Sequence, residues 1–175
     1  PLLKNDIPNK TIHLRIHYQK TGYARYISHL DLIRLFDRIF RRTGIDLSFT
    51  QGYNKRPKMS FGPPLPLGYT SEAEYMDIEV NSLPKTDIKK NLNSILPEGI
   101  QIRETKMIGM NHLPLTSSIS SMEYTIGLAN KAIKLSDIDQ LIQKESIPIS
   151  RRVKNRDKTI DIRPYIESIK KSDSK

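Results

Sequence analysis

Residues 28–43 read SHLDLIRLFDRIFRRT, in which apolar residues recur with the spacing of an amphipathic helix. Ser28 and Asp31 resemble a capping box with Asp in place of the usual Glu, and Gly44 is a typical helix end, so we predict a helix over Ser28–Thr43. One face of this helix carries its large apolar residues: Leu32, Ile33, Leu35, Phe36, Ile39 and Phe40. The opposite face carries four arginines: Arg34, Arg38, Arg41 and Arg42.

Strands are predicted before and after this helix. Thr11–Tyr18 alternates apolar and polar residues, as a half-buried strand does, and Ile45–Thr50 is predicted to be a second, short strand. Gln51–Tyr69 contains four prolines and three glycines, too many for regular structure, and is predicted to be a long loop. Three further elements follow: a strand at Glu74–Val80, a helix at Pro84–Leu96 and a strand at Ile100–Ile108.

The predicted order β-α-β-β-α-β is that of a ferredoxin-like domain, a four-stranded antiparallel sheet with both helices on one face. The later part of the chain repeats the order β-α-β-β: a strand at Met122–Leu128, a helix at Ser136–Lys144, a strand at Ile147–Val153, a turn at Lys154–Lys158, a strand at Thr159–Ile162 and a short final helix at Tyr165–Lys170. The predicted fold is therefore α+β. It comprises a disordered lead-in over 1–10, a ferredoxin-like domain over 11–110, a linker over 111–120 and a second, incomplete ferredoxin-like unit over 121–175.

Composition excludes several classes of protein. The chain has 175 residues, and its apolar runs are far shorter than the roughly 18 to 20 residues that span a bilayer. Without a signal-peptide core either, we expect a cytoplasmic protein with no membrane contact. The absence of cysteine excludes disulfides, thiolate zinc sites and iron–sulfur clusters, and the four histidines show no metal-binding spacing. We therefore expect no cofactor and no metal.

The positive charge is concentrated in two stretches. The net charge is +10, but residues 10–58 carry eleven Lys or Arg against three Asp or Glu, and residues 149–175 carry nine against four. Between them, residues 59–148 carry eight basic against eleven acidic residues. Such segregation favours a polyanion, and RNA in particular, as the partner.

Three patches account for this charge and are predicted to contact RNA. The arginine face of the helix can follow a phosphate backbone. The segment Tyr53–Lys58 places an aromatic ring among cations, a mixture typical of single-stranded RNA binders, and Arg151–Lys158 is predicted to be a hairpin with a basic tip. The predicted RNA-binding residues are Arg34, Arg38, Arg41, Arg42, Tyr53, Lys55, Arg56, Lys58, Arg151, Arg152, Lys154 and Arg156.

Each patch also has a structural interpretation. Asp31 and Asp37 lie three and four residues before Arg34 and Arg41, so both arginines can form ion pairs on the helix surface. The Pro-rich segment Phe61–Gly68 is better explained as a packed loop than as a binding site. The basic hairpin can equally be a sheet edge that its charges protect from aggregation.

The sequence contains no convincing catalytic constellation, and no enzymatic activity is expected. His29 is the one residue considered for acid–base chemistry, because RNA-cleaving CRISPR endonucleases with paired ferredoxin-like folds keep a histidine in a similar region; a structural role is favoured. An acidic run could hold magnesium, but a solvated strand face or an internal partner for the arginines is favoured. The run consists of Glu72, Glu74, Asp77 and Glu79.

Five segments resemble a bacterial radical-SAM-linked family, a domain of unknown function found alone or fused behind radical-SAM modules. They are Tyr26-Ile-Ser-His-Leu-Asp31, Gln51-Gly-Tyr-Asn54, Met59-Ser-Phe-Gly-Pro-Pro-Leu-Pro-Leu-Gly68, Ser71-Glu-Ala-Glu-Tyr75 with Asp77, and Asp161-Ile-Arg-Pro164. Two features depart from the family. Asn54-Lys55-Arg56-Pro57 stands where it usually reads N-P-H-P, and the family's C-terminal portion is cut short. The resemblance implies a partner that works on RNA or in translation.

The leading hypothesis is an RNA-binding module that positions RNA for a partner enzyme of RNA modification or processing, without a cofactor. An alternative is an adaptor that docks onto a radical-SAM or RNA-processing protein through Phe61–Gly68. A metal-independent ribonuclease that uses His29 is a third hypothesis. RNA binding is favoured if the basic patches meet on one surface, and the adaptor is favoured if they are scattered.

Overall fold

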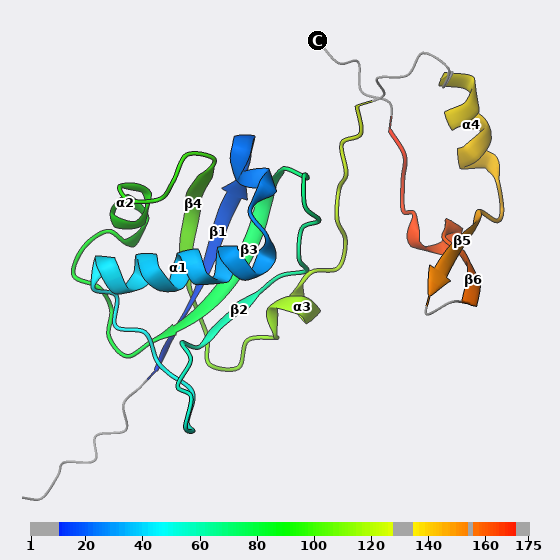
Figure 1. Cartoon of the computed structure of the whole chain (residues 1–175). Coiled ribbons are helices and arrows are strands. Elements are labelled where there is room, and N and C mark those ends of the chain that lie inside the picture. The colour runs from blue at the N-terminus through cyan, green and yellow to red at the C-terminus, as the bar shows by residue number, and fades with distance from the viewer. Residues whose placement is uncertain (1–10, 128–134, 154–155, 171–175) are drawn as a thin grey trace, which may run out of the picture. The chain divides into compact units, whose positions relative to one another are not determined.

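The computed structural model describes residues 11–127, 135–153 and 156–170, and the chain divides into two units, Pro1–Met122 and Glu123–Lys175 (Figure 1). The fold is α+β, with a four-stranded antiparallel sheet in the first unit and a two-stranded sheet in the second. Among the described residues, no helix is both long and apolar enough to cross a membrane.

The sheet of the first unit is built around β1 (Ile12–Lys20), whose alternate residues Leu14, Ile16, Tyr18 and Lys20 are buried. Its other strands are β2 (Met59–Phe61), β3 (Ser71–Val80) and β4 (Ile100–Ile108), in the order β2-β3-β1-β4. Since strand residues alternate between faces, every second residue of β1 and β3 faces the helices and the others face away.

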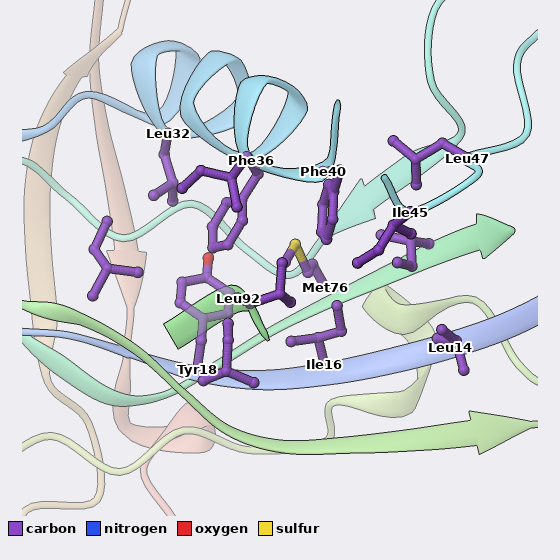
Figure 2. Close-up of a cluster of buried hydrophobic side chains, with 14 of the residues drawn as sticks. Leu14, Ile16, Tyr18, Leu32, Phe36, Phe40, Ile45, Leu47, Met76 and Leu92 are labelled. Carbon is purple, nitrogen blue, oxygen red and sulfur yellow. The ribbon is translucent and has the colours of Figure 1, made fainter. Parts of the chain in front are cut away.

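Two helices, α1 (His29–Thr43) and α2 (Ile88–Asn93), contribute to a single core on one face of this sheet. Figure 2 shows Leu32, Phe36 and Phe40 pointing from α1 towards the strands. The ring of Phe36 meets that of Tyr18 edge-on, with 5.2 Å between centroids. The apolar face predicted for α1 is therefore the face that builds the core.

The ends of α1 follow the predicted capping residues. Ser28 accepts a hydrogen bond from the backbone N–H of Asp31, and Gly44 takes the left-handed conformation with φ of 69°. The hydroxyl of Ser28 also donates to Asp31 Oδ2 at 2.7 Å. The helix therefore lies within one residue of its prediction at its start and ends as predicted.

The same hydroxyl holds the pKa of Asp31 below its ordinary value, with a smaller contribution from Arg34. A carboxyl with a lowered pKa contributes stability that is present above its unfolded pKa and is lost as the pH falls through its folded pKa. We expect Ser28→Ala to raise the pKa of Asp31, measured by NMR titration of its carboxyl carbon. Ser94→Ala, at an exposed site on α2's end, is the control and should leave that pKa unchanged; no change in Ser28→Ala would contradict the assignment.

The predicted strand at Ile45–Thr50 is wrong, and β2 lies instead within the predicted loop. Ile45 and Leu47 are buried, so the apolar pattern reflects packing. However, the segment forms isolated bridges and no strand. Leu47 pairs with Val80, the last residue of β3, and Phe49 pairs with Pro57. The segment changes partner between these two bridges, from β3 to the chain around Pro57, so neither bridge extends into a ladder.

The second predicted helix, Pro84–Leu96, is shorter than expected. The side chain of Asp87 accepts from the N–H of Lys90 and caps α2, which begins at Ile88, four residues after Pro84. At the end of α2, the side-chain amide of Asn93 accepts from Ile102 N–H at 2.8 Å and donates to Ile102 C=O at 3.0 Å. Asn93 therefore satisfies both backbone groups of a residue on β4.

Residues 111–120, predicted to be a polar linker, contain the one-turn helix α3 (Leu115–Ser118). Leu115 is buried, and α3 contacts β2 and β3. His112 Nε2 lies 3.8 Å from Asp77 Oδ2 on the sheet face turned away from the helices. The segment is thus packed against the first unit through Leu115, with His112 close to Asp77.

The second unit contains α4 (Leu135–Gln143), β5 (Pro148–Val153), β6 (Arg156–Asp161) and the 3₁₀ turn η2 (Arg163–Tyr165). The helix and the antiparallel strand pair confirm the prediction, although β6 begins earlier than Thr159. The strand predicted at Met122–Leu128 is wrong over 122–127, which the structure describes as chain outside any strand; Leu128 lies outside the described residues.

The final helix predicted at Tyr165–Lys170 is also wrong. Only the turn η2 forms, with Pro164 in its first positions, and the guanidinium of Arg163 donates to the carbonyl of Ile166. Six residues without a cap are too few to sustain a helix whose nucleation is costly.

Candidate nucleic-acid interface

The four arginines predicted on α1, hereafter the arginine stripe, lie on its solvent side. The core side of the same helix carries its buried residues, Leu32, Phe36, Ile39 and Phe40. All four arginines are exposed: Arg34, Arg38, Arg41 and Arg42. The structure therefore separates core and cationic faces as the sequence predicted.

Two members of the arginine stripe form the ion pairs expected from their spacing. Arg34 lies 3.2 Å from Asp31, and Arg41 lies 2.9 Å from Asp37. Such exposed pairs contribute only a few tenths of a kcal/mol, so phosphate can displace them. Arg38 and Arg42 form no ion pair within 4 Å among the described residues, although Arg38 contributes to the lowered pKa of Asp31.

The loop that follows α1 begins beside the end of the arginine stripe. The guanidinium of Arg41 lies 5.4 Å from the centroid of the Phe49 ring, and Phe49 pairs with Pro57. Next to this bridge, the N–H of Thr50 donates to Arg56 C=O, and the N–H of Arg56 donates to Thr50 Oγ1. Residues 51–55 therefore form the tip of a closed loop.

The tip of this loop presents an aromatic ring together with cations. Tyr53 is fully exposed, and Lys55 and Arg56 are exposed. Lys58, in contrast, is half-buried, and its ammonium lies 2.6 Å from Glu79 on the sheet face away from the helices. The arginine stripe thus contacts the base of the loop through Arg41 and Phe49, and the loop presents its exposed cations without Lys58.

The basic hairpin belongs to the second unit. Arg151 lies opposite Lys158, and Arg156 is two residues from Lys158, so these three share one face of the strand pair. Arg152 lies on the other face, opposite Asp157. Lys154 lies outside the described residues.

The acidic run is divided between the two sheet faces. Asp77 forms a bidentate ion pair with Arg15, at 2.8 and 2.9 Å, and Glu79 pairs with Lys58, both away from the helices. Glu74 lines a small pocket on the helix side. No group of three or more potential ligands that could hold a metal occurs in the part of the chain that the structure describes.

His29 lines the same small pocket as Glu74. Its ring meets Phe61 edge-on, with 5.6 Å between centroids, and Lys20 also lines the pocket. The ammonium of Lys20 donates to Ile27 C=O at 2.7 Å, and burial lowers its pKa. These contacts fix the local backbone before α1 and support the structural role expected for His29.

The sequence matches the model of a known protein family. The model describes an uncharacterized protein conserved in bacteria (DUF2344) and matches residues 13–175. The chain belongs to the DUF2344 family. No curated protein and no solved structure gives a significant match. The DUF2344 segment includes both units, so the arginine stripe, the loop and the basic hairpin all lie within it.

Sequence reasoning missed two features of this DUF2344 chain. The first is Lys20, which continues the buried alternation of Leu14, Ile16 and Tyr18; extending the period by one step would have found it. The second is a group of exposed aromatic and aliphatic residues near the start of α1, considered below.

Proposed function

We propose that this chain is an RNA-binding module that, without a cofactor, positions RNA for a partner enzyme of RNA modification or processing. The observation that carries the proposal is the contact between Arg41 and Phe49, which holds the base of the exposed loop against the end of the arginine stripe. Arg38 and Arg42, which form no ion pair within 4 Å in the described part of the chain, are the members most available to phosphate. The basic hairpin adds a second cationic surface in the other unit.

The architecture supports a ferredoxin-like interpretation of the first unit. Its elements follow the order β1-α1-β2-β3-α2-β4, and the sheet order β2-β3-β1-β4 is the one that such a connection produces. The resemblance of the sequence motifs to a radical-SAM-linked family makes such an enzyme the partner we propose first.

The proposal predicts a specific salt dependence. For the double variant Arg38→Glu and Arg42→Glu, we expect affinity for single-stranded RNA to fall by about tenfold and the slope of log K against log salt to decrease by about 1.4, since about 0.7 counterions are released per phosphate contact. Fluorescence anisotropy with a labelled oligonucleotide across a salt series measures both quantities.

A matched control reverses two charges elsewhere on the same unit. Arg103 and Lys106 are exposed on β4, at the sheet face away from α1. Arg103→Glu with Lys106→Glu should leave affinity within about twofold. Equal losses in both double variants would mean that net charge alone decides binding. No RNA binding by the unmodified chain would reject the proposal and leave the adaptor hypothesis.

A further inference from the structure

A group of large side chains lies exposed where α1 begins, and we call it the tyrosine surface. Its members are exposed over more than half of their area: Tyr23, Tyr26, Leu30, Leu67 and Tyr69. Single exposed apolar residues are ordinary, but a contiguous group marks a binding site.

Local geometry brings these residues to one place. Tyr23 and Tyr26 lie three residues apart in the 3₁₀ turn η1 (Gly22–Tyr26), in which residues at this spacing are stacked one above the other. The N–H of Gly68 donates to Arg25 C=O at 2.9 Å, which places Leu67 and Tyr69 beside η1. Segments more than 40 residues apart in the sequence therefore form one surface.

The tyrosine surface is continuous with the arginine stripe. Leu30, Arg34 and Arg38 follow one another at four-residue steps and so share one side of α1. Cations also lie within the surface, because the guanidinium of Arg25 is 4.8 Å from the centroid of the Tyr26 ring. One outer side of the first unit thus changes from aromatic residues at the start of α1 to arginines towards its end.

We propose that the tyrosine surface stacks the bases of a single-stranded RNA whose phosphates follow the arginine stripe. This inference rests on the proposed function and specifies its substrate class. Aromatic faces combined with a cationic track are the means by which proteins hold unpaired bases, whereas a duplex hides its base faces within the stack. A short single strand of a few nucleotides is the ligand that both halves of the surface accommodate.

Exposed tyrosines and leucines are also common at protein interfaces. In the tyrosine surface, the guanidinium of Arg25 lies against the ring of Tyr26, and the arginine stripe follows along α1. This combination favours a ligand that has both negative charges and flat rings, as a nucleic acid has. A protein partner is therefore an outcome that the experiment must separate from RNA.

The test compares two double variants with two ligands. Tyr23→Leu with Tyr26→Leu keeps apolar area but removes both aromatic faces, whereas Tyr23→Phe with Tyr26→Phe keeps them. We expect the leucine pair to weaken binding of an oligoadenylate by about tenfold or more and the phenylalanine pair to bind within about twofold of the unmodified chain. Inorganic polyphosphate, which has no bases, should bind all three proteins equally.

The outcomes also distinguish this inference from the proposed function. If the leucine pair binds oligoadenylate as tightly as the unmodified chain while Arg38→Glu with Arg42→Glu weakens it, RNA binding stands and base stacking on this surface is rejected. If the leucine and phenylalanine pairs lose affinity equally, the hydroxyls or a local disturbance, and not the ring faces, are responsible, and the inference fails. Circular dichroism melting of each variant confirms that the fold is retained.

Discussion

Replacing Phe36 with alanine is expected to lower the free energy of unfolding of the first unit by about 3 to 5 kcal/mol, the cost typical of deleting a buried aromatic ring. Phe36 is completely buried at the centre of the core, between Tyr18 on β1 and Phe40 one turn along α1. Its loss leaves a cavity at the contact between helix and sheet. Urea denaturation followed by far-ultraviolet circular dichroism measures the change.

Leu30 provides the control for this prediction because it lies on the same helix with its side chain exposed. Leu30→Ala should change the free energy of unfolding by no more than about 0.5 kcal/mol, as is usual for exposed sites. A similar loss in both variants would show that helix propensity, and not the core contact, determines the effect. The core assigned to the first unit would then be wrong.

Replacing Gly99 with alanine is expected to destabilise the first unit by about 3 kcal/mol, because a positive φ and a steric clash act together. Gly99 has φ of 87°, and a Cβ there would lie 2.4 Å from Thr21 O and 2.9 Å from Ala24 Cβ. The backbone of Thr21 also donates to Gly99 C=O at 2.7 Å, so the two segments cannot separate without losing that hydrogen bond.

Gly22 separates the two causes. It also has a positive φ, of 53°, but nothing lies within 4 Å of a Cβ built there. Gly22→Ala should therefore cost only about 1 kcal/mol, the penalty of the left-handed conformation. Equal losses at the two sites, measured by the same denaturation, would show that the close approach of the chain at Gly99 contributes nothing.

The sequence predicted best where local signals agreed. For α1, the cap at Ser28, the apolar spacing and Gly44 all indicated the same helix. The position of β2 could not be predicted, because three residues between prolines are too short to show a period, and their pairing depends on β3. The helix wrongly predicted at the end of the second unit lacked a cap and was too short to form without one.

For the candidate site too, the features that could be predicted were those that depend on local sequence. The separation of arginines from core residues follows from helical periodicity and was predicted. The contact between Arg41 and Phe49 is tertiary, and Lys58 is drawn to Glu79 across the edge of the sheet, so neither could be predicted from spacing along the chain. The tyrosine surface depends on the hydrogen bond between Gly68 and Arg25, which joins two distant segments.

The two hydrogen bonds between the side-chain amide of Asn93 and the backbone of Ile102 bear on aggregation of the protein. β4 is an edge strand, and unpaired backbone groups on such an edge invite another chain to add a strand. The amide of Asn93 occupies both backbone groups of Ile102, and the exposed charges of Arg103, Glu104 and Lys106 follow immediately. This stretch of the edge is therefore protected from the addition of a further strand, the step by which exposed sheet edges aggregate.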